Sequence, residues 1–316
     1  MREIIKMIFY RVKNNKGFLI TYLVIIPIII LIAILLTNNF TIKANIAIVG
    51  REDLQIQSDD IKVTILNEEP RDVDLVLGKY DAVVIFQGDA FEIKTTRGEE
   101  TKQAIEEILK GNVPNWGSGN TRGAVSNIFG FNMMIILMLG VQLYKFYFDE
   151  RNGINKRIIS TNISYTKYLF SHFIVVFLFL FVPACIMIIS SIFIFQISTA
   201  VTILQILFIL FVLCLFATSF GLFLNTLAKS IESSMMIGNM IMILTTIISG
   251  SFVAVTDNKV FTAITKILPQ KQIMDYTIAL ENKTNSNLMG IIYIIGLSAV
   301  FTLLGIWAEK KLMANR

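Results

Sequence analysis

Long apolar runs alternate with short polar segments along most of the chain, and one long polar stretch interrupts this pattern near the start. A helix rises about 1.5 Å per residue, so about twenty apolar residues cross a hydrocarbon core of roughly 30 Å. Runs of about this length, with no Lys, Arg, Asp or Glu in their middle, lie at residues 18–36, 128–147, 168–195, 201–224, 235–255 and 288–307. The pattern therefore predicts an all-α membrane protein with six transmembrane helices.

The first apolar run has an alternative interpretation as a cleaved signal peptide, because basic residues precede it. However, residues 18–37 are longer than the apolar region of a signal peptide, which spans about 7–15 residues. The residues that follow, 37–40 (TNNF), form no small-residue cleavage site. We therefore expect residues 18–37 to be an uncleaved first span, which Pro27 kinks.

The long polar stretch, residues 38–127, has the pattern of a small soluble domain. Short β-type runs at 45–49, 61–66 and 82–86 precede a segment at 99–109 in which apolar residues recur at helical spacing. A linker rich in Gly and Pro follows. We predict one α/β domain inserted between the first and second spans, and no internal repeat.

Residues 1–17 have the pattern of an amphipathic helix. Ile4, Ile8 and Val12 share one face, and basic residues lie mostly opposite. Such a helix lies in the membrane interface, with its apolar face toward the acyl chains. The alternative is a basic flank that only sets topology.

Composition and charge support a membrane protein and give its orientation. Hydrophobic residues make up 54% of the 316 residues, charged residues only 16%, and the mean hydropathy is +0.67, whereas soluble domains carry about 25% charged residues. Basic clusters lie before the first span, between the second and third, and after the last. Six spans put all three clusters on the cytoplasmic face, so we expect cytoplasmic termini and an outward-facing inserted domain. That segment holds fifteen Asp and Glu against ten Lys and Arg.

The net charge of +5 does not indicate nucleic-acid binding, because the basic residues flank apolar runs and form no patch with aromatic residues. The high usage of Ile, Asn and Lys is typical of an AT-rich bacterium, so we expect the bacterial plasma membrane.

No pattern in the sequence indicates catalysis, a metal or a cofactor. A P-loop and an HExxH motif are lacking, Cys185 and Cys214 lie in apolar runs, and His172 has no triad pattern around it, so we expect a packed or interfacial histidine. The spans also lack the charged residues that an ion-coupled carrier needs, which favours an external energy source. Four amides in or near the spans are candidate pathway residues: Asn132, Gln142, Gln205 and Asn225. The alternative, hydrogen bonding between packed helices, stays open for each.

The loop at 148–167 carries opposite charges close together around Gly153, namely Asp149, Glu150, Arg151, Lys156 and Arg157. This pattern predicts a short helix that docks a partner protein. A plain topology signal is the alternative.

Taken in order, these segments resemble the ABC-2 type transporter permeases, which include bacterial drug, antibiotic-peptide and sodium exporters. The loop resembles that family's coupling loop in Glu150, Arg151, Gly153, Arg157 and Tyr168, although Asn162 and Ile163 stand where the family often has a Pro-containing pair. The stretch at 78–91 resembles a motif of the family's outer domain, with Gln87 near the usual Pro. The segment at 249–280 resembles the region after the fifth span, including its Leu268-Pro269 turn.

The resemblance implies a permease domain at 128–316, with the coupling loop at 148–167 and an outer re-entrant or interfacial segment at 256–285. It implies that ATP is bound by a separate ABC ATPase subunit, and that the permease forms a homodimer or a heterodimer with a related permease. We expect export of a hydrophobic or amphipathic compound, such as an antimicrobial peptide or a drug, and hence a role in antibiotic resistance. Sodium extrusion, or a membrane sensor with an outer ligand domain, are the alternatives.

Overall fold

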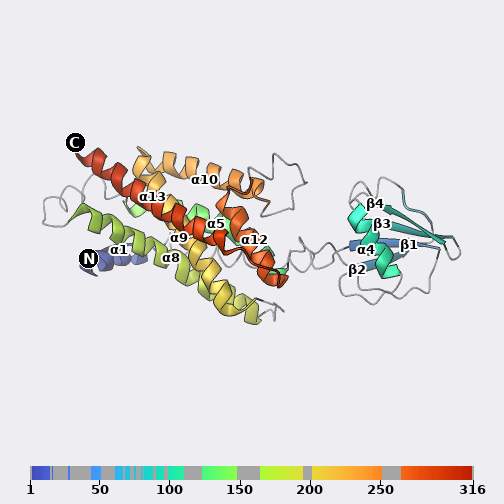
Figure 1. The fold of residues 1–316 in the computed structure, drawn as a ribbon. Helices are drawn as coiled ribbons and strands as arrows, with labels where there is room; N and C mark the ends of the chain where they lie inside the picture. The colour runs from blue at the N-terminus through green and yellow to red at the C-terminus, as the bar shows by residue number, and fades with distance from the viewer. Residues whose placement is uncertain are drawn as a thin grey trace. The chain divides into compact units, whose positions relative to one another are not determined.

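The computed structural model (Figure 1) describes the chain in segments. They cover residues 2–14, 16, 28, 44–50, 61–66, 68–71, 75, 80, 82–87, 90–95, 99–109, 123–147, 164–194, 201–250 and 265–314. The chain divides into two compact units, one of residues 1–34 and 122–316 and the other of residues 35–121. The second unit covers most of the segment at 38–127. The first predicted span, residues 18–37, lies almost wholly outside the described residues.

The inserted unit is a four-stranded mixed sheet with a helix packed against it. Its elements are β1 (Ala44–Val49), β2 (Ile61–Leu66), β3 (Ala82–Gln87), β4 (Ala90–Thr95) and α4 (Glu99–Leu109). The strand order is β2-β1-β3-β4, with β1 parallel to β2 and β3, and β4 antiparallel to β3. Ile105 of α4 is buried with Ile46, Ile48 and Val84 on one face of the sheet. Tyr80 and Leu75 pack with Ala47 and Val83 on the other.

The sequence pattern missed β4. Only two residues separate β3 from β4, and Gln87 pairs with Ala90 across the hairpin. The Gly-Asp pair between them is a turn signal, so this strand was detectable. Its alternation of apolar Phe91 and Ile93 with Glu92 and Lys94 is a half-buried strand pattern.

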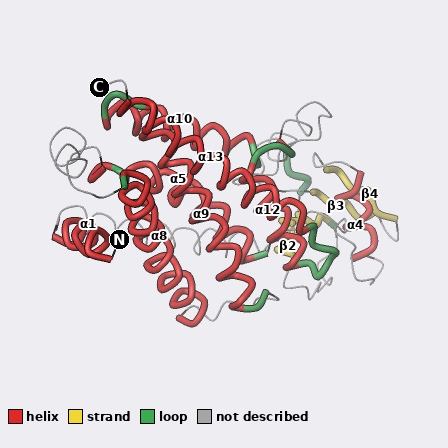
Figure 2. Tube along the Cα trace, turned by 60° about the vertical axis from the view of Figure 1, so that its left-hand side comes forward, coloured by secondary structure: helices red, strands yellow, loops and turns green. Residues whose placement is uncertain are grey.

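Five helices of the described residues are long and apolar enough to cross a membrane. They are α5 (Ala124–Gln142), α8 (Tyr165–Ile194), α9 (Ile203–Leu227), α10 (Ile231–Ile248) and α13 (Leu288–Ala314). A shorter helix, α12 (Pro269–Glu281), packs beside α13 and α5, and Figure 2 shows it as a short red segment next to the long ones. These five helices match the five predicted spans that follow the insertion.

Local signals set several helix ends. Capping boxes begin α9 at Thr202 with Gln205 and α10 at Ser230 with Ser233, and each satisfies backbone N–H groups that lack helical partners. Pro269 opens α12 at its first position, where proline is favoured because its missing N–H would have no partner. Pro183 lies inside α8, as helices in membranes tolerate.

The N-terminal helix α1 (Arg2–Asn14) is amphipathic, as predicted, and packs on α8. Ile4, Ile8 and Val12 are its buried residues. The ring centroids of Phe9 and Phe179 lie 5.1 Å apart. Its apolar face is therefore covered in part by another helix.

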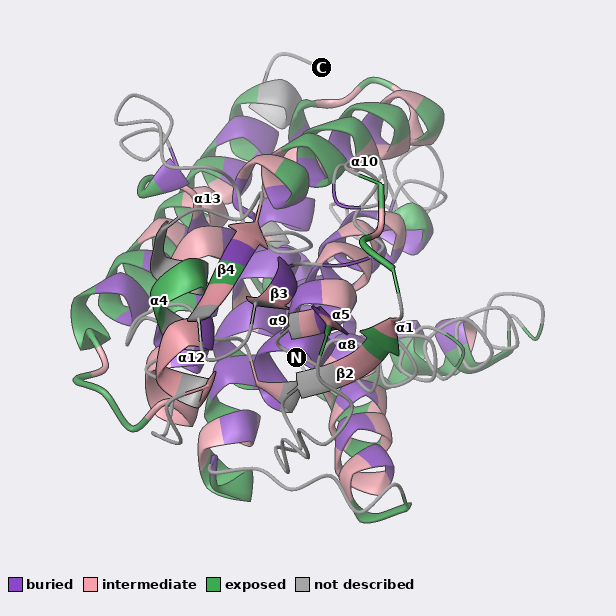
Figure 3. Ribbon diagram, turned by 90° about the vertical axis from the view of Figure 1, so that its right-hand side faces the viewer, coloured by how far each residue is buried: buried purple, intermediate pink, exposed green. Residues whose placement is uncertain are grey.

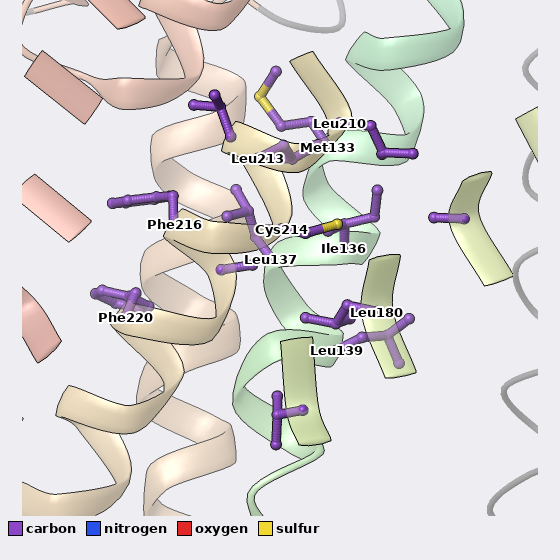
Figure 4. Close-up of a cluster of buried hydrophobic side chains, with 14 of the residues drawn as sticks. Met133, Ile136, Leu137, Leu139, Leu180, Leu210, Leu213, Cys214, Phe216 and Phe220 are labelled. Atoms are coloured by element: carbon purple, nitrogen blue, oxygen red, sulfur yellow. The ribbon is translucent and has the colours of Figure 1, made fainter. Parts of the chain in front are cut away.

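Helices α5 and α9 form the centre of the bundle. In the most apolar 18-residue stretch of each helix, 72% is buried, against 33% in α8, 28% in α13 and 22% in α10. Figure 3 shows this contrast, with buried residues along α9 and many exposed residues on α10. In Figure 4, the side chains of Met133 and Leu137 on α5 lie against Leu213 and Cys214 on α9. The outer helices thus turn apolar faces outward, as a bilayer or a partner helix requires.

Small residues allow α5 and α9 to approach closely. A Cβ added to Gly140 would lie 2.6 Å from the carbonyl oxygen of Ala217, and one added to Gly221 would meet the carbonyl oxygen of Gly140. Ala217 and Gly221 are four residues apart on one face of α9, the spacing that brings membrane helices together. The Tyr144 hydroxyl also donates to the Thr218 carbonyl oxygen at 3.2 Å.

Candidate functional site in the helical core

The predicted coupling residues Glu150, Arg151, Gly153 and Arg157 lie outside the described residues. The last described part of the helix before them ends at Tyr147, and the chain is described again from Ser164. Their role stays a prediction. The candidate site that the structure does describe is the set of polar groups buried among α5, α9, α10 and α12.

Asn225 joins α9 to α5. It is fully buried, and its Nδ2 donates to the carbonyl oxygens of Val141 at 3.1 Å and Gly221 at 2.7 Å. Its Oδ1 is buried and makes no hydrogen bond to any described residue. The amide therefore binds two helices together and still has an acceptor to offer.

The other three predicted amides lie in different environments. Asn132 is buried and donates to the Ile128 carbonyl oxygen of its own helix at 2.8 Å. Gln142 is half-buried at the end of α5. Gln205 completes the capping box of α9, where its Oε1 accepts from the Thr202 N–H at 2.9 Å. The structure thus does not bring the four amides together at one place.

A polar stripe on α10 was not predicted from the sequence. The buried residues of α10 are Ser234, Gly238, Met242 and Thr246, each four residues from the next. A Cβ added to Gly238 would lie 2.9 Å from Val141 Cγ1 and 3.1 Å from Leu224 Cδ1, so this stripe faces α5 and α9. The signal in the sequence was the recurrence of the small residues Ser234, Gly238 and Thr246 on one helical face of an apolar segment.

Several polar atoms of α10 are buried without partners. The hydroxyls of Ser234 and Thr246 and the Oδ1 of Asn239 make no hydrogen bonds to described residues. The remaining surface of α10 is apolar and exposed, and includes Met236, Met240, Leu244 and Ile247. The helix therefore turns its unsatisfied polar groups inward and its apolar groups outward.

Gln270 of α12 extends this polar region, and the sequence reasoning also missed it. It is 2% exposed, and its Nε2 donates to Thr245 Oγ1 at 2.7 Å. The Thr245 hydroxyl donates its own proton to the Ile241 carbonyl oxygen at 2.7 Å. It must therefore be the acceptor in its hydrogen bond with Gln270. Gln270 Oε1 is then left buried with no hydrogen bond to any residue that the structure describes.

A buried polar atom without a hydrogen bond costs about 1–3 kcal/mol, and native structures hold few of them. Here Asn225, Ser234, Asn239, Thr246 and Gln270 each carry one. These residues come from α9, α10 and α12, helices that contact one another or α5. A water molecule or another polar group would be needed to satisfy them.

The predicted packed histidine lies between aromatic rings. His172 is buried, and its ring meets those of Tyr168 and Tyr147 edge-on at 4.7 and 5.6 Å between centroids. Among the described residues, no group of His, Cys, Asp and Glu could hold a metal ion.

The family model for the ABC-2 family transporter protein matches residues 50–308, which include most of the inserted unit, four of the described spans and the fifth up to residue 308. No curated protein matches the chain.

Proposed function

Because the chain belongs to the ABC-2 family of transporter proteins, we propose that it is the permease subunit of an ATP-driven exporter. A membrane subunit of this family works with an ABC ATPase, and the chain has no P-loop of its own. ATP hydrolysis therefore takes place on a partner subunit.

The observation that best supports the proposal is the two-sided character of α10. Only 22% of its most apolar stretch is buried, so most of its surface faces away from the bundle. Its inward stripe contains the small residues Ser234, Gly238 and Thr246, and the hydroxyls of Ser234 and Thr246 make no hydrogen bond to a described residue. A helix that moves outward from α5 would open a polar passage, and its hydroxyls would gain partners.

The proposed substrate is a hydrophobic or amphipathic compound, such as an antimicrobial peptide or a drug. Apart from the helix ends, the described spans carry no Lys, Arg, Asp or Glu. Amides and hydroxyls instead supply the polar surface. Such a lining suits a compound with few charges better than an ion path.

The ATPase would engage the cytoplasmic loop at 148–167 through Glu150, Arg151, Gly153 and Arg157. Arg151 and Arg157 can bind carboxylates of the partner in bidentate fashion. The exporter would contain two permease chains, identical or related, and two ATPase subunits. The termini would lie in the cytoplasm of a bacterium, and the inserted unit outside its plasma membrane.

The proposal is tested by purification of the tagged full chain from native membranes in mild detergent, followed by mass spectrometry and an ATPase assay. We expect an ABC ATPase to co-purify and to be lost when Glu150→Ala and Arg151→Ala are combined. Glu68→Ala with Arg71→Ala is a matched control, because it removes one acidic and one basic residue from the exposed surface of the inserted unit.

A second arm measures transport in liposomes that contain the purified complex. ATP-dependent movement of a fluorescent amphipathic peptide supports the proposed substrate class, whereas movement of radioactive sodium alone would replace it with sodium extrusion. A stable chain without any ATPase partner contradicts the exporter and favours the membrane sensor.

A further inference from the structure

The carboxylate of Glu281, which is distant in the sequence, caps the N-terminus of α5. Its Oε1 accepts from the Val125 N–H at 2.7 Å, and its Oε2 accepts from the Gly123 N–H at 3.0 Å and the Ser126 N–H at 3.1 Å. The Ser126 hydroxyl donates to the same Oε2. One side chain at the end of α12 thus accepts hydrogen bonds from four donors that lie more than 150 residues away in the sequence.

Each of the two helix ends is unfavourable by itself. The N-cap of α5 is Gly123, which makes no side-chain cap, and no acidic residue stands in the first turn. Glu281 is the last residue of α12, where the partial negative charge of the helix C-terminus opposes a carboxylate. The contact resolves both problems, because the anion of one helix meets the partial positive charge of the other.

Gly123 leaves room for the carboxylate in this position. Its φ of −88° is open to any residue, but a Cβ at this position would lie 2.5 Å from Glu281 Oε1. Gly123 is also the second residue after the inserted unit, which ends at Thr121. Residues 1–34 and 122–316 form the unit that contains the five described spans, here called the membrane unit. Gly123 therefore lies where the chain returns to this unit after the insertion, and Glu281 binds it there.

We propose that Glu281 is a releasable latch between α12 and the N-terminus of α5. The contact is polar and half-buried, so water can replace it when the helices separate. Neither helix depends on it for its own backbone hydrogen bonds beyond the first turn. In this inference, which rests on the proposed function, the latch holds the outer end of the bundle closed until the transport cycle opens it.

Three amides report the latch directly. The first N–H groups of a helix have no acceptor four residues earlier, so among the described residues Glu281 is the acceptor that protects the Gly123, Val125 and Ser126 N–H groups from hydrogen exchange. The Asn127 N–H is different, because it already donates to the Gly123 carbonyl oxygen at 3.2 Å. Exchange at residues 123–126 therefore measures opening without unfolding of α5.

The test is hydrogen exchange with mass spectrometry on the full chain in lipid nanodiscs. In the wild type, we expect exchange at 123–126 to be faster than in the middle of α5 and at least about tenfold slower than in Glu281→Gln. Glutamine has one acceptor oxygen and places an NH₂ group against several donors, so it cannot serve all four. Glu281→Asp, which keeps the charge, should restore part of the protection.

Asp275→Asn is the matched control. Asp275 lies on the same helix, and its Oδ1 pairs with Lys271 Nζ at 2.7 Å, so its substitution removes a charge of the same sign from the surface of α12. It should leave exchange at 123–126 unchanged. If the wild-type amides exchange as slowly as the middle of α5, the contact never opens. If exchange is equal in wild type and Glu281→Gln, the contact does not form. Either result overturns the latch.

A second measurement tests its use in transport. In the complex with the ATPase, exchange at 123–126 should differ by about tenfold or more between nucleotide-free and nucleotide-trapped states, since charge-assisted bonds are broken in one of them. No difference would overturn the role of the latch in the cycle. The first measurement needs no ATPase, so a failed co-purification contradicts the proposed function while the exchange data still decide whether the latch opens.

Discussion

The backbones of Gly140 and Gly221 are in direct contact, because the carbonyl oxygen of Gly140 occupies the place where a side chain at 221 would begin. This contact sets the distance between α5 and α9, the two helices with the most buried spans. The position of the other helices around this pair depends on it.

Replacement of Gly221 by Val should therefore destabilise the membrane unit by about 1–3 kcal/mol or more, since the added carbons force the two helices apart. The free energy of unfolding in mixed micelles measures the change. Gly296→Ala in α13 is the control, because nothing lies within 4 Å of a Cβ at that position. A stability of Gly221→Val close to that of the control would contradict the close approach.

The neighbouring residues Thr245 and Thr246 should respond in opposite directions to the same change. Thr245→Val removes the acceptor of Gln270 and should destabilise the protein by about 1 kcal/mol. Thr246→Val removes a buried hydroxyl that makes no hydrogen bond within the described part of the chain, and should leave stability unchanged or raise it by about 1 kcal/mol. Unfolding in mixed micelles checks both variants.

If the Thr246 hydroxyl meets substrate or water in the open state, Thr246→Val should also slow transport while it stabilises the resting protein. The ATP-dependent rate in liposomes measures this effect. Full transport activity in a stabilised Thr246→Val protein would argue against a polar passage along α10.

Asn225→Leu should weaken the contact between α5 and α9 by roughly 0.6–1.7 kcal/mol, the range found for hydrogen bonds between membrane helices. The Nδ2 group donates to both Val141 and Gly221, and leucine of similar size loses both bonds. Leu224→Ile on the same helix keeps the apolar character and volume, so it serves as the control. The comparison uses the same unfolding assay, and an unchanged stability would show that Asn225 does not hold the helices together.

The topology predicts which residues are reached from outside the cell. In a variant with Cys185 and Cys214 replaced by Ala, Glu68→Cys should react with a membrane-impermeant maleimide in intact cells. Lys310→Cys should react only after permeabilisation. Labelling of both positions from the same side would require an even number of spans between them, and would contradict the five spans that follow the inserted unit.

The sequence by itself determined the spans and the inserted domain. Five apolar runs became long helices because a bilayer, like a protein core, leaves backbone groups no partner outside the segment. The β-runs at 45–49, 61–66 and 82–86 became strands of one sheet, since they are short, rich in β-branched residues and bounded by turn signals. These features depend on neighbours along the chain, which the sequence displays.

Only the tertiary structure decided which polar groups meet. The pattern drew attention to Gln205, which caps its own helix, and gave no reason to select Gln270 or Glu281. Gln270 is significant because Thr245 lies across from it, and Glu281 because the N-terminus of α5 stands at its carboxylate. Those partners are 25 and 156 residues away, and no local periodicity encodes a contact of that length, because it is fixed by how the helices pack rather than by where each helix begins and ends.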